Sequence, residues 1–253
     1  MRRDRATDVR DRASPLSLLT QMHCTNFLKK EQLDLCVLLD VALFVWYDAC
    51  ASNSLKENGT MSEIMAPTIY FSQTGTVNTA RTLELARARA EALGIHNVLV
   101  ATTTGMTGVQ AAQSLQGFGV IVVTHSAGFR EPDTQELDEK NREAIEAAGA
   151  KILTCQHAFG GVGRAVRRKL GTYQLEEIIA FTLRTFCEGI KVSAEMALMA
   201  ADAGLVCTGE PVIAVAGTGR GADTAVVLRP ANAQDFFDLR FLEIICMPAP
   251  GHP

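Results

Sequence analysis

The chain has 253 residues, of which 47% are hydrophobic and 21% charged, and its formal net charge at neutral pH is −4. This length accommodates one large domain, or one domain with an appendage, and is long enough to bury a sizeable core. The net negative charge argues against a nucleic-acid-binding protein, which needs a basic face. No apolar run approaches the roughly 18 residues that a membrane span requires, so we expect neither nucleic acid nor a membrane as a partner.

Seven cysteines are scattered along the chain without a CxxC pair. An odd, dispersed set in a chain of this length is typical of buried thiols in a reducing compartment, not of a disulfide framework. We therefore expect a cytoplasmic protein. The cysteines are Cys24, Cys36, Cys50, Cys155, Cys187, Cys207 and Cys246.

Residues 1–65 and 66–253 differ in pattern, and we predict an amino-terminal extension followed by one domain. The extension opens with the charge-rich MRRDRATDVRDR, carries the short apolar run Leu33–Trp46 with two aspartates inside it, and closes with the loop-like ASNSLKENGT. Three interpretations stay open. The first is that the apolar run is a secretory signal, although its distance from the amino terminus and the acids inside it argue against this. The second is that the run forms an amphipathic helix that docks on the domain. The third is that the natural start of the protein is Met61 or Met65.

From Ala66 onward, short strands rich in Val, Ile and Ala alternate with helices. Asn78 is a candidate cap for a helix that ends at Gly94. The strand over 224–229 follows its predecessor after a short loop, so we expect it to be antiparallel, because a parallel crossover needs a dozen or more residues. The alternation indicates an α/β fold with a doubly wound, largely parallel sheet in a three-layer sandwich. Strands are predicted at 68–72, 97–101, 120–124, 151–154, 212–216, 224–229 and 242–246, and helices at 79–93, 107–115, 134–148, 163–170, 174–187 and 193–203.

The segment VATTTGMTG follows the strand over 97–101 and leads into a helix. Open backbone amides at a helix start, with hydroxyl groups beside them, suit a phosphate group. The segment contains no lysine and is therefore not a Walker loop. The alternative is that Thr104 or Thr107 only caps the helix. The predicted binding residues are Thr102, Thr103, Thr104, Gly105 and Thr107.

The segment AGTGRGADT follows the strand over 212–216 and has three glycines in five residues. Such glycines let the backbone approach a ligand closely. Arg220 can pair with phosphate in a forked geometry, and Asp223 can orient that arginine or accept from a ligand hydroxyl. The alternative is a tight turn in which Arg220 and Asp223 form a surface pair. The predicted binding residues are Gly217, Thr218, Gly219, Arg220, Gly221, Ala222 and Asp223.

Both loops follow the carboxyl end of a buried strand, the edge at which open α/β sheets bind ligands. If the strands over 97–101 and 212–216 are neighbours, the two loops face each other across a crevice. Thr124 and His125 follow another strand and are predicted to line the same crevice. The basic segment over 159–170 is a candidate second anion contact or a solvated helix face. No nucleophile triad and no metal-ligand spacing is evident, so we assign no catalytic residue and no metal.

These segments closely resemble the stand-alone proteins related to the carboxy-terminal α/β domain of pyruvate kinase. The resemblance covers roughly 68–248 and depends chiefly on GTGRGADTAVVLRPAN, with TTTGMT and FFDLRFLEIICMP in support. In pyruvate kinase the matching threonine-rich loop receives a sugar-phosphate effector. The resemblance implies that flavin mononucleotide (FMN) can occupy the crevice. Pyruvate kinase activity is not expected, because its catalytic barrel has no counterpart here.

The residues and the resemblance together predict a protein that binds a phosphorylated ligand, with FMN as the first candidate. A regulatory module for a phosphorylated metabolite, without redox chemistry, is the second hypothesis. A purely structural domain is the third. Whether the protein is a flavoenzyme and whether it forms a homo-oligomer stay open at this point.

Overall fold

The computed structural model describes residues 63–249, nearly all of which belong to one compact unit that begins at Met65. The predicted extension lies almost wholly outside the described residues, and so do the three interpretations of it. Cys24, Cys36 and Cys50 also lie outside them. The assignment of residues 1–65 therefore stays a prediction.

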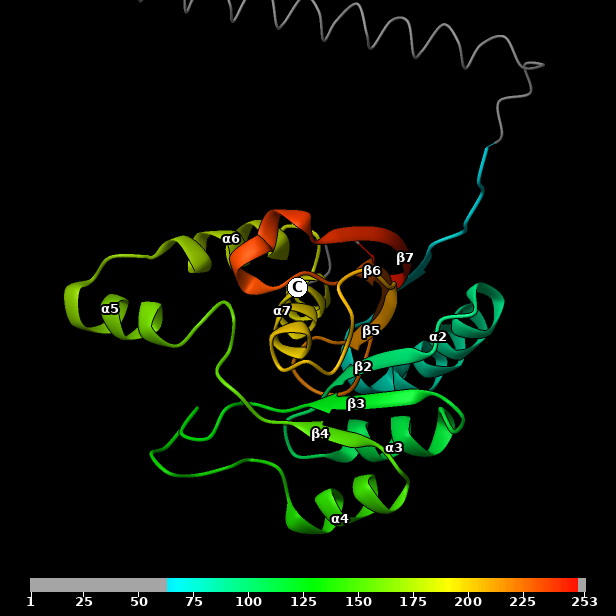
Figure 1. Cartoon of the computed structure of the whole chain (residues 1–253), viewed down its shortest axis with the longest axis horizontal. Coiled ribbons are helices and arrows are strands. Elements are labelled where there is room, and N and C mark those ends of the chain that lie inside the picture. Colours follow the sequence, from blue (N-terminus) through cyan, green and yellow to red (C-terminus); the bar gives the residue numbers. More distant parts are fainter. Residues whose placement is uncertain (1–62, 250–253) are drawn as a thin grey trace, which may run out of the picture. The chain divides into compact units, whose positions relative to one another are not determined.

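Seven strands form one sheet in the order β1-β7-β6-β5-β2-β3-β4 (Figure 1). Neighbouring strands are parallel except where β6 meets β5 and β7. The predicted antiparallel strand is thus confirmed, since the seven residues over 217–223 are too few for a parallel crossover. The strands are β1 (Ile69–Phe71), β2 (Asn97–Ala101), β3 (Gly119–Val123), β4 (Lys151–Leu153), β5 (Val212–Ala216), β6 (Thr224–Arg229) and β7 (Arg240–Pro248).

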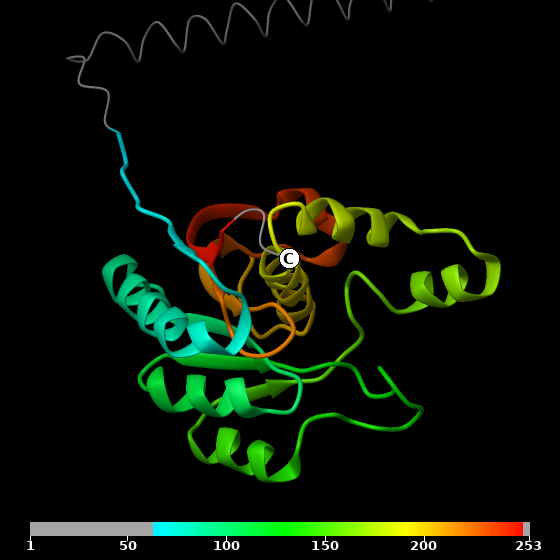
Figure 2. The same ribbon diagram turned by 180° about the vertical axis from the view of Figure 1, so that it is seen from behind.

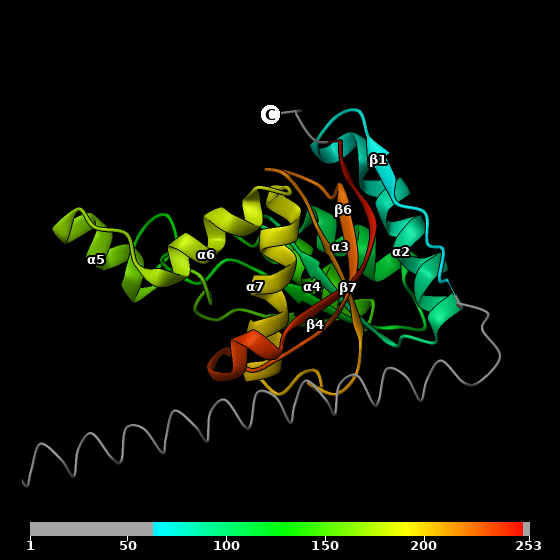
Figure 3. The same cartoon turned by 90° about the horizontal axis from the view of Figure 1, so that it is seen from above.

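Helices cover both faces of the sheet, and three of them lie side by side on one face (Figure 2). These three are α2 (Thr79–Leu93), α3 (Met106–Ser114) and α4 (Glu139–Ala147). On the other face lies α7 (Glu188–Asp202), while α5 (Val162–Leu170) and α6 (Leu175–Arg184) project from the body beside it (Figures 1 and 3). Two 3-10 helices, η1 (Gly75–Asn78) and η2 (Ala233–Asp238), complete the described elements.

The core consists of two apolar layers, one on each face of the sheet. In β2, Val98 and Val100 pack toward α2 and α3, whereas Leu99 between them packs toward α7. All three side chains are fully buried, as expected of a central strand covered on both faces. The doubly wound, largely parallel three-layer fold is therefore confirmed.

Some predicted helix starts are wrong. The helix predicted from residue 134 begins at Glu139, because Asp138 accepts hydrogen bonds from the amides of Lys140 at 3.0 Å and Asn141 at 3.3 Å and so fixes the helix start. The last helix begins at Glu188, not at residue 193. Asn78 does not cap α2.

The side chain of Asn78 instead donates to the carbonyl of Gln73 at 2.7 Å, so a contact with the preceding loop replaces the cap. The predicted end of α2 is confirmed, since Gly94 adopts the left-handed conformation there. None of the helices within 63–249 is long and apolar enough to cross a membrane.

The four cysteines in the described part of the chain are free thiols, and the prediction of buried thiols holds only for Cys246. Burial raises the pKa of the Cys246 thiol to about 11. Cys207 is exposed, and Cys155 and Cys187 are half-buried. No disulfide joins these four.

Candidate functional site

The two predicted loops leave the sheet from neighbouring strands. β2 and β5 are parallel, with Val100 opposite Val215, and each loop begins two residues later. Neighbouring strands are about 4.8 Å apart, so the loops start close together. β2 continues through α3 on one face, whereas β5 is entered from α7 on the other. The winding of the sheet therefore reverses between these strands, which is where such sheets bind ligands.

Thr102 caps α3, although the sequence alternatives named Thr104 and Thr107 for this role. Its Oγ1 accepts from the amides of Gly105 at 3.2 Å and Gly108 at 3.4 Å. Thr102 and Thr107 are buried. Of the predicted hydroxyl groups in this loop, only that of Thr104 is exposed, and that of Thr103 is half-buried.

The start of α3 leaves several amides open. Within residues 63–249, the amides of Thr103, Thr104, Met106 and Thr107 have no hydrogen-bond acceptor. The loop is nevertheless held firmly, because the carbonyl of Thr104 accepts from Asp138 N at 3.2 Å and from Asn141 Nδ2 at 2.8 Å. A fixed loop with open amides at a helix start is a ready anion site.

Asp223 serves the fold and does not orient Arg220. It is fully buried, and its Oδ2 accepts from the amides of Gly75 at 2.7 Å and Thr218 at 3.1 Å. Its Oδ1 accepts from the Thr224 hydroxyl at 2.9 Å. None of the ion pairs in the described part of the chain joins it to Arg220, so the alternative of a surface pair between Arg220 and Asp223 is wrong.

Two of the three loop glycines are required by packing within the chain. A Cβ on Gly217 would lie 2.5 Å from the Gly221 carbonyl, and one on Gly221 would lie 2.5 Å from both Thr76 Cα and Thr79 Oγ1. Only Gly219 faces open space. The segment SQTGTVN after β1 therefore packs against the glycine loop at this edge of the sheet. The sequence did not identify this contact, although the glycine and threonines of the segment could have indicated it.

Arg220 is exposed, as are Thr104 and Gly219. Thr103, His125, Gly217, Thr218 and Gly221 are half-buried. The remaining predicted binding residues have buried side chains or backbone: Thr102, Gly105, Thr107, Thr124, Ala222 and Asp223. A ligand at this edge can therefore reach side chains of the first two groups, and of the buried group chiefly the open backbone amide of Thr107.

A second polar cluster lies beyond the ends of β3 and β4, next along the same edge. His125 Nδ1 is 2.6 Å from Glu136 Oε2. Phe129 stacks on the rings of His125 and His157, with centroid distances of 4.0 and 5.0 Å. Thr124 is buried here, with its hydroxyl 2.7 Å from that of Thr154. The predicted His125 thus lies at the crevice edge, held by a carboxylate.

Glu195 of α7 is a buried carboxylate with three partners, the first being the amide of Phe159, which donates to its Oε1 at 2.9 Å. His157 Nδ1 is 3.5 Å from Glu195 Oε2, and Lys191, one turn earlier on α7, forms an ion pair with the same carboxylate. Burial raises the pKa of Glu195, but the hydrogen bond from His157 and the charge of Lys191 outweigh it and hold that pKa at about 2. The lysine and the carboxylate are both buried.

Most of the basic segment over 159–170 forms α5, and two of its three arginines have partners. Arg164 lies over the Phe129 ring, 4.7 Å from its centroid. Arg167 Nε is 2.6 Å from Glu177 Oε1. Arg168 and Lys169 are exposed, so the solvated-face interpretation describes this helix better than a second anion contact.

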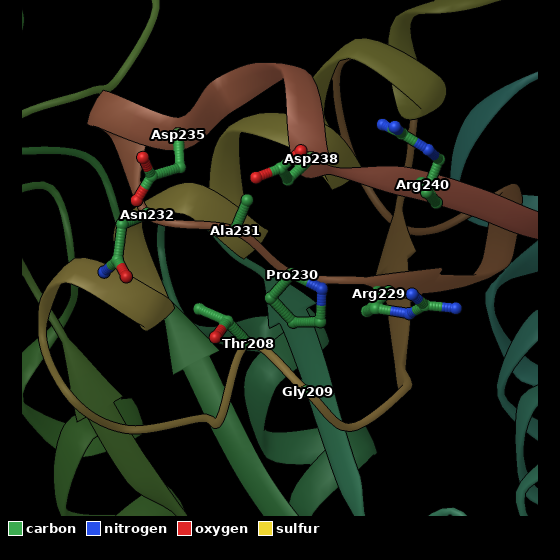
Figure 4. A pocket seen from close by; sticks show the side chains of 9 residues that line it. All are labelled: Thr208, Gly209, Arg229, Pro230, Ala231, Asn232, Asp235, Asp238 and Arg240. Atoms are coloured by element: carbon green, nitrogen blue, oxygen red, sulfur yellow. The ribbon is translucent and has the colours of Figure 1, made fainter. Parts of the chain in front are cut away.

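A cavity of about 380 Å³ lies at the opposite edge of the sheet, before β5 and after the antiparallel β6. Figure 4 shows Thr208, Asn232 and Asp235 on one side of it and Arg229 and Arg240 on the other. The guanidinium of Arg240 donates to the carbonyl of Leu239 at 2.9 Å. None of the predicted site residues lines this cavity. Its lining was missed because its charges come from separate elements.

Comparison with known families agrees with this fold. The family described as pyruvate kinase, alpha/beta domain, matches residues 80–228, more than half of the chain and both loops of the crevice. The chain belongs to this family. The resemblance inferred from TTTGMT and GTGRGADT is thereby confirmed.

Solved structures that match part of this chain include two of a pyruvate kinase from Cryptosporidium parvum. One is 15% identical, covers 60% of this chain and 22% of that chain, and has a TM-score of 0.33. The other, in complex with ADP, is 14% identical, covers 64% and 23%, and has a TM-score of 0.30. A CinA superfamily protein from Enterobacter cloacae is 16% identical over 71% of this chain and 91% of that one, with a TM-score of 0.23. The alpha/beta domain protein described here thus spans less than a quarter of the pyruvate kinases it matches.

Proposed function

We propose that this domain binds a phosphorylated small molecule, with FMN as the first candidate, in the crevice between the loops over 102–107 and 217–223. The pairing of β2 with β5 carries the proposal. It brings the open amides at the start of α3 and the exposed guanidinium of Arg220 to one edge of the sheet. These groups come from segments more than 100 residues apart in the chain.

The donors at this edge suit a phosphate dianion. The α3 amides point out of a helix amino terminus, whose dipole favours negative charge. The hydroxyls of Thr103 and Thr104 add neutral donors, and Arg220 adds a forked, permanently charged one. A hydrogen bond to a charged group contributes about 1.5–3 kcal/mol and a neutral one about 0.5–1.5 kcal/mol. Arg220 should therefore be the strongest single contact.

The choice of FMN rests on the resemblance to stand-alone family members. The residues present fit its phosphate, and Gly219 offers open backbone beside it, since a Cβ there would meet nothing within 4 Å. A bound flavin would supply hydride- or electron-transfer chemistry. The chain's own contribution would be binding and orientation, with His125 next along the edge. No residue is assigned a catalytic role.

The test begins with the absorption spectrum of freshly purified protein. Ligand-free protein is then titrated with FMN and with riboflavin and followed by flavin fluorescence. Riboflavin should bind at least about tenfold more weakly, because it lacks the charged contacts. Arg220→Ala should weaken FMN binding by about tenfold or more, and Thr104→Ala by less. Arg229→Ala is the matched control, an exposed arginine at the opposite edge.

Each alternative has its own result. Equal affinity for FMN and riboflavin would refute the phosphate anchor. A colourless protein that ignores both flavins but binds a sugar bisphosphate tightly would favour the regulatory module. Loss of binding in Arg229→Ala, with Arg220→Ala unchanged, would move the site to the cavity of Figure 4.

A further inference from the structure

The arm formed by α5, α6 and the residues around them (162–186, hereafter the arm) leaves an apolar surface in water. Seven large apolar side chains in it are more than half exposed. They account for about half of the large exposed apolar side chains within 63–249, although the arm is a small part of that length. They are Val162, Leu170, Tyr173, Leu175, Ile178, Phe181 and Phe186.

The composition of α6 shows that it is built to be covered on two sides. Ile179, Ala180 and Leu183 pack inward against α7 and neighbouring residues. Leu175, Ile178 and Phe181 follow one another at three-residue steps on the outer face. A helix with one face on the core normally has polar residues on its outer face, so three large apolar residues there indicate a second cover. Here one face has no cover among the described residues.

α5 is held in position mainly by its contacts with α6. Its only fully buried residue is Gly163, where an added Cβ would run into the side chain of Glu176 on α6. Arg167 ties it to Glu177 of the same helix. Figures 1 and 3 show the two helices extending away from the sheet. α5 therefore contributes little to the core of the domain, whereas α6 packs one face against it.

We propose that the arm is a self-association surface, on which the arms of two copies of this chain pack against each other around a two-fold axis. Covering the seven side chains would remove on the order of 600 Å² per copy from water, if each exposed aromatic side chain contributes about 100 Å². That approaches the roughly 800 Å² per partner of a standard stable interface. Aromatic residues and arginine, both present here, are enriched in such interfaces.

The charges of the arm also fit a second copy. α5 carries no acid, and its Arg168 and Lys169 are exposed. Arg167 and the buried Glu177 already pair within one copy, which leaves the half-buried Glu176 as the accessible acid in the first turn of α6. In a two-fold interface, residue i of one copy meets residue j of the other and the reverse. α5 of each copy can then lie beside the acidic start of its partner's α6. The apolar outer face belongs to α6, whose first turn is acidic, whereas a helix that binds anionic membranes carries basic residues on its polar face.

The test uses the full chain in sedimentation equilibrium over a concentration series. The parent should form dimers, and Ile178→Glu with Phe181→Glu should raise the dimer dissociation constant by roughly 30-fold or more, the effect of losing an interface hot spot. Both side chains are exposed, so the monomer should fold, which circular dichroism checks. Leu93→Glu and Phe237→Glu are matched controls, because these exposed apolar residues lie outside the arm.

A photo-crosslinking amino acid at position 181 identifies the occupant directly. Cross-linked peptides from residues 162–186 of a second copy would support the proposal. It would be overturned by a parent that stays monomeric, by arm variants that dimerise like the parent, or by cross-links to residues 1–62 of the same chain. Binding of the parent, but not the arm variant, to vesicles of anionic lipid without self-association would also overturn it.

Discussion

Asp223→Ala should destabilise the domain by about 3–6 kcal/mol. The carboxylate is fully buried and accepts three hydrogen bonds, from the amides of Gly75 and Thr218 and from the Thr224 hydroxyl. Each buried donor left without an acceptor costs about 1–3 kcal/mol. The half-buried Thr218 amide can turn to water, so its share is the smallest. A loss of this size is a large fraction of a typical stability of about 5–15 kcal/mol.

Asp223→Asn is the companion variant, because it keeps the shape of the side chain. Its amide oxygen can accept from both backbone amides, and its NH₂ group can donate to the Thr224 hydroxyl. We expect a loss of about 1–2 kcal/mol, since neutral hydrogen bonds replace charged ones. Urea unfolding followed by circular dichroism measures both variants. An alanine variant with the parent's midpoint would refute the structural role. An asparagine variant with the parent's midpoint but no ligand binding would make Asp223 a ligand contact.

Three further predictions follow from the same structure. Gly221→Ala should lower the free energy of unfolding in urea by about 2–4 kcal/mol, because its Cβ would strike Thr76 and a left-handed backbone disfavours alanine. Gly219 has the same φ of 75° but open space around it, so Gly219→Ala should lower the free energy of unfolding by only about 1–2 kcal/mol. The pKa of Glu195, lowered from 4.5 to about 2, means that its stabilisation is present above about pH 4.5 and lost as the pH falls toward 2. The parent should therefore lose roughly 2 kcal/mol between pH 6 and pH 3 that Glu195→Gln does not lose. A chain that starts at Met65 should keep the melting temperature and ligand affinity of the full chain, and insoluble protein would show the extension to be part of the core.

The sequence predicted the elements better than it predicted their ends. Runs such as VLVA and VIAVA are recognisable as strands because a short strand covered on both faces is apolar at nearly every position. The start of α4 was misplaced because its amphipathic pattern extends back into the preceding loop. There Glu136 is held by His125, 2.6 Å away, and Asp138 caps the start of the helix, so that α4 begins one residue later. Contacts of this kind depend on tertiary structure, which periodicity does not encode.

The order of the strands, and with it the site, was only partly accessible. The short loop between β5 and β6 required an antiparallel pair. The pairing of β2 with β5 could only be stated as a condition. The paired residues, such as Val100 and Val215, are 215 − 100 = 115 positions apart in the chain, and neither strand carries a local mark of its partner. The contact between Gly75 and Asp223 spans 148 residues. This contact makes Asp223, which was predicted to bind the ligand, a residue that stabilises the fold.

The buried carboxylate of Asp223 limits where an external anion can bind. It already takes the amides of Gly75 and Thr218, so a phosphate group is left with the start of α3 and with Arg220. Two unit charges about 8 Å apart repel by about 2 kcal/mol at an effective dielectric constant near 20. Arg220 would therefore both contact the phosphate and offset this repulsion.

This double role predicts coupling between the two side chains. Arg220→Ala alone should weaken FMN binding by more than one lost contact would. Adding Asp223→Asn to Arg220→Ala should restore part of the affinity, because it removes the repelling charge while keeping the shape of the loop. The restoration should shrink as salt is added, since the repulsion is screened. A double-mutant cycle measured by flavin fluorescence gives the coupling directly. Strictly additive effects at low salt would show that the Asp223 charge does not reach the bound phosphate.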